Sequence, residues 1–508
     1  MSPFWLITLL LSAGPGGPCP PPVGGWSRGG EVCAPPPGCE QPAPHPGDVT
    51  VKGPDAAAQM DALCERYNGV DGDLIVDSVD LTDLSGLSCV CGVGGDLVIR
   101  RSPGLRTLDG LGQLHRVGGD LVLEELPAFE RLSGLDALDW LDDDLVLRRL
   151  GALADLRGLP ALGQLWGDVV LQDNPALRSL HGLEWLETLP GRLIVHDNPV
   201  LEDLGGLESL REITDDLRLM DNPGLDDLRA LRSLERIGGA LLLLQIGVED
   251  LGGLSGLREV GGGVHLVSNP SLERLRGFGP VAELPWLRVT HNPALESLRG
   301  LEALTRAGAV TIEHNPELWD LRGLDNLGRV GELTLLANDA LRSLEGLTRL
   351  EAVDGPMVVR LNPALEDLRG VERLARVDGP LRVLNNGALR RLDGLSGLRE
   401  VGSLELGSNH RLIDLTALRS LEEVHGDLRI RWSVALVSLV GLEALRAVEG
   451  DLELRFNFQL TSLTPLAGLA SVGGDVVLGD NPDVPHGDVA ALMGQLGEGL
   501  VGGLRIEE

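Results

Sequence analysis

The amino-acid sequence predicts an all-β fold, a β-solenoid of about 18 coils with one leucine-rich repeat of 23 or 24 residues in each coil. Three features lead to this prediction: a regularly spaced asparagine, a short segment of alternating apolar residues before it, and leucines at three-residue intervals after it. In chain order, the asparagine slot holds Val79, Ser102, Leu126, Leu150, Asn174, Asn198, Asn222, Ile246, Asn269, Asn292, Asn315, Asn338, Asn362, Asn386, Asn409, Ser433, Asn457 and Asn481.

One repeat, residues 167–186, shows how each element of a coil is predicted. Val169 and Leu171 alternate with Val170, and this period of two is typical of a strand with one buried face. Asn174 then opens a turn, where its side chain can bond backbone groups of its own and adjacent coils. Glycines interrupt most of the leucine runs that follow, so we expect little helix. Because one unit cannot bury its own apolar face, neighbouring coils must stack around a column of Leu and Val.

The pattern Gly-Asp-Leu-x-Leu-x-x-Asn-Pro-x-Leu-x-x-Leu-x-Gly-Leu-x-x-Leu, which residues 167–186 meet almost in full, resembles the receptor L-domain repeat. This is the leucine-rich right-handed β-helix of insulin and EGF receptor ectodomains, also seen in fungal cell-wall proteins and exported bacterial proteins. The resemblance covers roughly residues 60–500, and the coil at residues 215–234 departs from it with Asp215 and Ala230 in glycine positions. It implies a right-handed solenoid in an exported protein, and the Arg-rich, Lys-poor composition favours a bacterium. The cysteine-rich modules of the animal receptors are missing, so their hormone-binding surfaces are not carried over.

The beginning of the chain predicts export. An apolar stretch, residues 4–13, fits the core of a signal peptide and is too short to cross a bilayer, which takes about 20 residues. We expect no transmembrane segment. A region dominated by Pro and Gly follows and is typical of an extended linker. The predicted organisation is a signal peptide at 1–14, a linker with cysteines at 15–54, an N-terminal cap with the first coil at 55–91, the repeat solenoid at 92–484 and a C-terminal cap at 485–508.

All cysteines lie in the first 91 residues, at Cys19, Cys33, Cys39, Cys64, Cys89 and Cys91. An even, clustered set in an exported chain is typical of a disulfide block that caps one end of a fold. We expect Cys64 to pair with Cys89 or Cys91 and so to close the first coil. Zinc binding is the alternative, although the Cys-x-Cys spacing does not match a zinc finger. Cys19 could instead carry a lipid anchor, since a Pro/Gly-rich tether follows it.

Composition and motifs exclude several functions. The formal net charge of −33 argues against a nucleic-acid partner, which needs a basic surface. Aromatic residues make up 3% of the chain, which disfavours a small-molecule pocket. Nucleophile-elbow, phosphate-loop and metalloprotease motifs are missing from the sequence, so we predict no catalytic, cofactor-binding or metal-binding residue and no cofactor. The acidic runs lack calcium-loop spacing and are expected to be solvated corners, at residues 142–144, 215–216 and 226–227.

Two surfaces could carry binding. The outward strand position is aliphatic in seven of the first eight coils, which indicates either a contact surface or simply the strand preference of Val and Ile. In a later part of the chain, arginines lie close to Trp432, Phe456 and Phe458, and Arg with aromatic residues is typical of interface hot spots; a local packing variation is the alternative. The candidate binding patch is Arg429, Arg431, Trp432, Arg455 and Phe456.

These observations predict an exported, non-catalytic protein in the periplasm, at the cell surface or in the medium, where it recognises a protein or a glycan. One alternative is a purely structural spacer of the cell envelope. A more remote one is a carbohydrate-active enzyme, because some parallel β-helices are polysaccharide lyases, although no residue in the sequence supports it.

Overall fold

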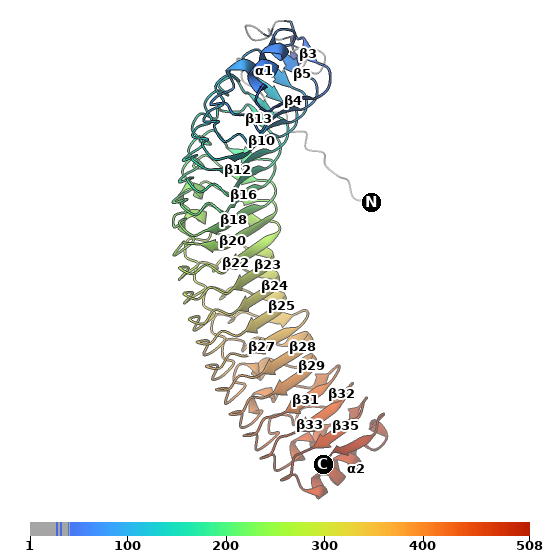
Figure 1. Cartoon of the computed structure of the whole chain (residues 1–508). Coiled ribbons are helices and arrows are strands. Elements are labelled where there is room, and N and C mark those ends of the chain that lie inside the picture. The colour runs from blue at the N-terminus through green and yellow to red at the C-terminus, as the bar shows by residue number, and fades with distance from the viewer. Residues whose placement is uncertain (1–26, 29–30, 33–38, 40, 508) are drawn as a thin grey trace. The chain divides into compact units, whose positions relative to one another are not determined.

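A computed structural model describes residues 27–28, 31–32, 39 and 41–507, and it divides into two units. Unit 1 holds the described residues up to Gly151 together with Arg157–Gly167, and unit 2 holds Ala152–Leu156 together with the residues from Asp168 onward. In each unit, parallel strands stack as successive rungs (Figure 1). The predicted signal peptide, Cys19 and Cys33 lie outside the described residues.

Unit 1 contains two parallel sheets and a helix. Strand β4 (Val49–Lys52) already belongs to the sheet with the longer strands, although its residues fall within the expected linker. Buried Val51 continues the alternating pattern, and β4 pairs with β6 (Leu74–Asp77). The helix α1 (Ala56–Cys64) separates these two strands, and β1 (Ser27–Arg28) pairs antiparallel with β2 (Glu31–Val32). The sheet with the longer strands holds, in unit 1, β4, β6, β8 (Leu97–Arg100), β10 (Leu121–Leu126) and β12 (Leu145–Leu150). The sheet of two-residue strands holds β3 (Pro44–His45), β5 (Gly69–Val70), β7 (Gly92–Val93), β9 (Arg116–Val117), β11 (Trp140–Leu141) and β13 (Gln164–Leu165).

Unit 2 continues the same repeat in one long parallel sheet with short strands beside it. In five coils the short and the long segment merge into one strand of eight or nine residues. The long strands are β14 (Val169–Gln172), β16 (Leu193–His196), β18 (Leu217–Asn222), β20 (Ala240–Ile246), β22 (Gly263–Val267), β23 (Glu283–Thr290), β24 (Arg306–Glu313), β25 (Arg329–Leu336), β27 (Met357–Arg360), β28 (Arg376–Leu384), β29 (Glu400–Gly407), β31 (Leu428–Arg431), β33 (Leu452–Arg455), β35 (Val476–Gly479) and β36 (Leu504–Glu507). The two-residue strands are β15 (Thr188–Leu189), β17 (Glu212–Ile213), β19 (Arg236–Ile237), β21 (Glu259–Val260), β26 (Ala352–Val353), β30 (Glu423–Val424), β32 (Ala447–Val448) and β34 (Ser471–Val472).

Helix is scarce, as the glycine-interrupted leucine runs predict. Unit 2 has one α-helix, α2 (His486–Leu496), within the residues expected to form the C-terminal cap. The other helical segments of the described chain are single 3₁₀ turns at 85–87, 229–231, 252–254, 395–397, 416–418, 464–468 and 497–499. None of the helices in this part of the chain has the length and apolar composition needed to cross a membrane. The predicted β-solenoid is therefore confirmed. It has about 19 turns rather than the predicted 18, because the turn that contains β4 precedes the first coil counted from the asparagine slot.

The inward side chains of the strands and the regularly spaced leucines form the core. Val169 and Leu171 are fully buried, and so are Leu177, Leu180 and Leu183 of the same coil. Strand pairing keeps the predicted outward residues opposite one another within each unit. In unit 1 these are Ile75, Val98, Val122 and Val146, and in unit 2 they are Val170, Ile194, Arg218, Leu242, His265, Arg288, Thr311, Thr334, Val358, Arg382, Glu405, Arg429, Glu453 and Val477.

A column of buried asparagines links successive coils of unit 2. The Oδ1 of Asn315 accepts the backbone N–H of Asn292 at 3.1 Å, and its Nδ2 donates to the carbonyls of Val289 at 2.9 Å and Glu313 at 3.0 Å. Each asparagine therefore satisfies backbone groups that the turn leaves unpaired, as the sequence predicts. At the apolar slot Ile246 the strand β20 extends to the slot, and Ile246 pairs directly with Asn222.

A second column, of aspartates at the start of the strands, was not predicted. In unit 1, Asp96 Oδ1 accepts the N–H of Asp120 at 2.8 Å, and Asp120 Oδ1 accepts that of Asp144 at 2.9 Å. In unit 2, Asp216 Oδ1 accepts the N–H of Ala240 at 2.7 Å. The expectation of a solvated corner is thus wrong for Asp216. Burial raises the pKa of Asp120, and the carboxylates of Asp144 and Asp96 raise it further against the lowering effect of the Asp144 N–H.

Two disulfides close the beginning of unit 1. Cys64, the last residue of α1, bonds to Cys89, and Cys91 bonds to Cys39. The first pair is one of the two alternatives expected from the sequence, and the second takes up the other candidate cysteine. Disulfides are typical of proteins in an oxidising environment outside the cytoplasm.

Candidate functional site

The residue before each asparagine slot has a left-handed backbone. These residues, one in each coil, are here called the left-handed column, and several residues of the candidate sites belong to it. Eighteen non-glycine residues of the described chain have φ between 51° and 58°, although this conformation costs roughly 1–2 kcal/mol for an L-residue. The left-handed column consists of Ser78, Arg101, Glu125, Arg149, Asp173, Asp197, Asp221, Gln245, Ser268, His291, His314, Ala337, Leu361, Asn385, Ser408, Trp432, Phe456 and Asp480.

Two aromatic members of the left-handed column stack on each other. The ring centroids of Trp432 and Phe456 lie 4.0 Å apart, with an interplanar angle of 12°. Phe458 approaches Trp432 edge-on at 6.4 Å, and the Arg455 guanidinium lies 5.0 Å from the centre of the Phe456 ring. Trp432 is 45% exposed and Phe458 42% exposed. Trp432, Phe456 and Phe458, here called the aromatic ledge, therefore present apolar surface to solvent with a cation beside it.

The other two arginines of the predicted patch are engaged within the sheet. Arg429 pairs with Asp427 at 2.6 Å and with Glu453 at 3.3 Å. Arg431 pairs with Glu405 at 2.5 Å and with Glu453 at 3.7 Å. The structure thus brings Trp432, Arg455 and Phe456 together, but it holds Arg429 and Arg431 with carboxylates of their own coil and of neighbouring strands. The sequence does not reveal the pairs between strands directly, because those partners lie up to 26 residues apart.

A cavity adjoins the aromatic ledge. It has a volume of about 370 Å³, and Phe458 belongs both to the ledge and to the cavity wall. Most of the remaining lining is apolar, including Leu478, Val484, Val489 and Ile506. Ile506 is 61% exposed, so the apolar surface continues beyond the cavity. Ledge and cavity together can take an apolar group and a ring or planar group that stacks on the aromatic face.

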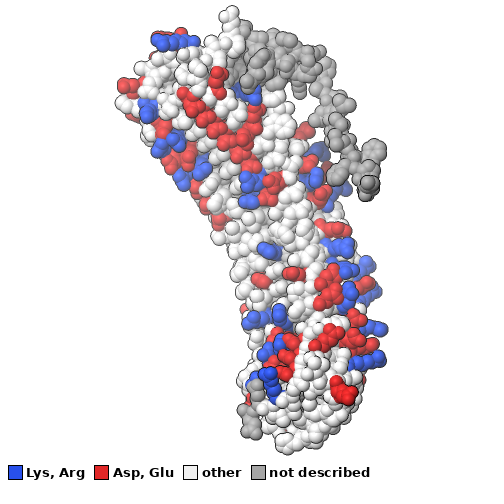
Figure 2. Space-filling model, turned by 90° about the vertical axis from the view of Figure 1, so that its right-hand side faces the viewer, with Lys and Arg blue, Asp and Glu red and all other residues white. Residues whose placement is uncertain are grey.

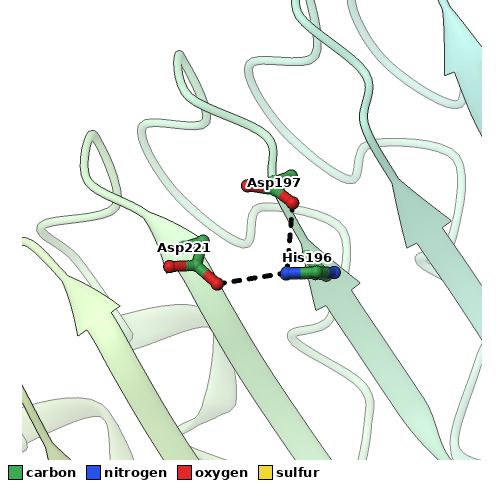
Figure 3. Close-up of side chains that lie close together, drawn as sticks. All are labelled: His196, Asp197 and Asp221. Carbon is green, nitrogen blue, oxygen red and sulfur yellow. Dashed lines mark hydrogen bonds and ion pairs between the residues drawn. The ribbon is translucent and has the colours of Figure 1, made fainter.

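A histidine and two aspartates meet in a second cluster of unit 2 (Figure 3). His196 ends β16, and Asp197 and Asp221 occupy the left-handed column in successive coils. The Nε2 atom of His196 lies 3.1 Å from Oδ2 of Asp197 and 3.1 Å from Oδ2 of Asp221. Ligands of a tetrahedral zinc ion lie about 3.3 Å apart, given bonds of about 2.0–2.1 Å. These three atoms could therefore hold such an ion. Without an ion, the same distances fit an imidazole N–H of His196 that is shared between the two carboxylates.

Short ligand spacings in the sequence do not indicate this cluster, because Asp197 and Asp221 lie 1 and 25 positions from His196. The repeated Asp-Asn pair that ends at Asn198 and Asn222 is the signal that points to it. The left-handed column also stacks His291 on His314, with ring centroids 4.5 Å apart. In unit 1, Asp120, Asp143 and Asp144 bring carboxylate oxygens within 4.8 Å of one another.

The aliphatic outward residues of unit 1 are partly covered. Ile75, Val98 and Val122 are half-buried, and Val146 is 9% exposed. Neighbouring strands place these side chains directly beside one another, so each one shields the next. Strand preference and mutual packing account for this stripe without a partner.

No family model and no curated protein matches the chain. Among solved structures, the "Crystal structure of TLR13-ssRNA13 complex" aligns with 87% of this chain and 82% of that chain at 15% identity and a TM-score of 0.21. A TM-score this low carries no conclusion about fold, ligand or activity.

Proposed function

We propose that the chain is an exported, non-catalytic recognition protein of the receptor L-domain type that binds a protein or glycan partner through the aromatic ledge and the adjoining cavity. The stacking of the exposed Trp432 on the half-buried Phe456 is the observation that carries this proposal. Aromatic residues are only 3% of the chain, yet both phenylalanines of the aromatic ledge contact Trp432, and Phe458 also lines the cavity. Exposed aromatic side chains next to an arginine supply the contacts that dominate binding energy in interfaces.

The cavity favours binding over catalysis. Asp480 is the one carboxylate among the residues that line it, whereas glycoside hydrolysis ordinarily uses a pair of carboxylates. Its lining is otherwise mainly apolar, with His486 as the other titratable side chain. This composition suits the burial of a partner's apolar group better than acid–base chemistry on a sugar. The disulfides support an extracytoplasmic location, either released or held through a lipid at Cys19.

The decisive experiment compares three baits in a surface extract of the source organism. The baits are the wild-type chain, the Trp432→Ala/Phe456→Ala double variant and the Trp319→Ala variant. Trp319 is a matched control, because it is 44% exposed and lies beside Arg322 at 5.7 Å. The double variant should fold, since Ala337 already occupies the same left-handed position in another coil.

We expect a partner that the wild type and Trp319→Ala retain and that the double variant loses, with unchanged circular dichroism for all three baits. Direct titration of the recovered partner should show a loss of at least about tenfold, because removal of a buried aromatic hot spot typically costs 2 kcal/mol or more. A wild-type bait that retains nothing would favour a structural spacer. Equal retention by the double variant would place the binding surface elsewhere.

A further inference from the structure

Four arginines line an open groove of about 560 Å³ in unit 2, away from the residues of the aromatic ledge. Arg306 and Arg329 begin β24 and β25 and lie opposite each other in the sheet. Arg349 and Arg373 occupy the same position in two successive repeats, three residues before the first residue of β26 and of β28. The repeat thus places the guanidinium groups of successive coils along the same groove.

Most of this positive charge is not neutralised within the protein. Arg306, Arg349 and Arg373 are exposed and form no ion pair or side-chain hydrogen bond with any described residue. Arg329 differs, because its guanidinium binds Asp354 at 2.6 Å and lowers the pKa of that carboxyl. Three cationic groups therefore remain available to a ligand in the groove.

The surrounding sequence also lacks the acidity of the rest of the chain. Residues 299–419 contain 16 arginines and 18 acidic residues, whereas the whole chain contains 43 basic and 76 acidic residues. On the face that Figure 2 shows, acidic side chains cluster in the part that carries α1, and basic and acidic ones alternate towards the part that carries α2. An anion near the groove thus meets less repulsion than the net charge of the chain suggests.

A glycine leaves room for a ligand. Gly328 lines the groove, and a Cβ atom built there would lie 3.9 Å from the carbonyl oxygens of Arg349 and Thr305, which is ordinary contact. Thr305 and Glu351 occupy the same slot in the neighbouring coils, so neither the backbone nor its surroundings require glycine. The space above Gly328 is therefore open because the side chain is missing there.

The lining favours a sugar chain over a peptide. Besides the arginines it consists of Glu283, Thr305, Asn326, Gly328 and Glu351, and it includes no apolar side chain larger than the threonine methyl. Centres of protein interfaces are typically apolar and aromatic, which this groove is not. Arginine forks bind carboxylate and sulfate groups, and Glu, Asn and Thr side chains can bond hydroxyl groups.

We propose that the groove around Gly328 binds an anionic glycan, with Arg306, Arg349 and Arg373 contacting its carboxylate or sulfate groups. This site is separate from the aromatic ledge and does not depend on the function proposed for it. Its ligand is defined by charge and hydroxyl groups, whereas the aromatic ledge selects for apolar and planar surface.

The test is calorimetric titration of the full chain with polygalacturonate, dextran sulfate, neutral dextran and poly-L-glutamate at low and physiological salt. We expect binding of polygalacturonate, dextran sulfate or both, with an affinity that falls as salt rises. The stronger of the two identifies the anionic group. Neutral dextran and poly-L-glutamate should bind at least about tenfold more weakly, since each lacks part of the recognised chemistry.

Two variants locate the site. Arg349→Gln/Arg373→Gln should weaken binding at least about tenfold, because hydrogen bonds to charged groups are generally worth that much. Gly328→Glu should do the same by placing a carboxylate in the open space. Ala375→Glu, with the same charge change in the same slot of a later coil outside the groove, should leave binding within about twofold of wild type. An unbound wild type, equal loss in Ala375→Glu, or poly-L-glutamate binding as tightly as the glycans would overturn the proposal.

Discussion

Replacing Asn315 by alanine tests whether the asparagine column holds adjacent coils of unit 2 together. The side chain is fully buried and connects three coils. Its Oδ1 accepts the backbone N–H of Asn292, and its Nδ2 donates to the carbonyl of Val289 and to Oδ1 of Asn338 at 3.2 Å. Alanine removes all of these bonds and supplies no other partner.

The expected cost follows from the one backbone group that loses its only partner. The N–H of Asn292 would be buried without a hydrogen bond, at about 1–3 kcal/mol, whereas the carbonyl of Val289 keeps its sheet bond in the paired strands β23 and β24. The local free energy of opening should therefore fall by about 2 kcal/mol, within a range of about 1–3. Since about 1.4 kcal/mol corresponds to a factor of ten, the Asn292 amide should exchange with solvent about thirtyfold faster.

Hydrogen exchange with mass or NMR detection measures this locally, which is necessary because a long repeat array need not unfold in one step. The matched control is Asn326→Ala, in which a half-buried asparagine loses one bond to the carbonyl of Glu302. That substitution should change stability by no more than about 0.5 kcal/mol. If the Asn292 amide keeps its wild-type protection in Asn315→Ala, or if both variants lose the same amount, the column does not stabilise the stack as argued.

Three other predictions address charge, crosslinks and backbone strain. Burial raises the pKa of Asp320, so the charged carboxylate destabilises the folded state at a pH above its folded pKa, and this cost disappears below the unfolded pKa. Asp320→Ser should therefore be more stable than wild type in urea unfolding at pH 7. It should lose that advantage as the pH falls below about 4. An equal advantage at both pH values would contradict this cause. Cys64→Ser/Cys89→Ser, which opens a crosslink with a sequence separation of 25, should destabilise the β6 region by about 3 kcal/mol in hydrogen exchange and leave unit 2 unchanged; equal loss in both units would refute a local role. Leu361→Asn should stabilise unit 2 by about 1 kcal/mol in guanidinium unfolding, because Leu361 is exposed and has φ 57°, a backbone conformation that asparagine adopts more readily than leucine. An unchanged stability would show that the left-handed leucine is not strained.

Periodicity predicted most of the fold, because every coil repeats the same physical requirement. An inward residue such as Leu171 must be apolar, and the slot of Asn174 must supply a side chain that bonds the backbone. The outward positions followed from the period of two alone. The aspartate column was not predicted, because acidic residues such as Asp120 next to glycine are typical of solvated corners. Only the stacking of coils shows that each carboxylate accepts the backbone N–H of the next coil.

The candidate site was less predictable, because its contacts run between coils. The sequence placed Trp432 and Phe456 in one region but could not show that both have left-handed backbones and stack. It also could not separate Arg455, which lies on an aromatic ring, from Arg429, which is held by carboxylates of its own and a neighbouring strand. Linear spacing reports neighbours along the chain, whereas this surface is assembled from residues about one repeat apart.

The left-handed column separates what a coil displays from what holds it together. Residues as different as Ala337, His291 and Trp432 share nearly the same φ, so the backbone at this position is insensitive to the identity of its side chain. The neighbouring asparagine slot is buried and its bonds do not involve the displayed side chain. A single substitution in the column can therefore alter the chemistry of the outer surface while the coil remains intact. Randomising adjacent column positions, 23 or 24 residues apart in sequence, would diversify paired side chains on a constant scaffold.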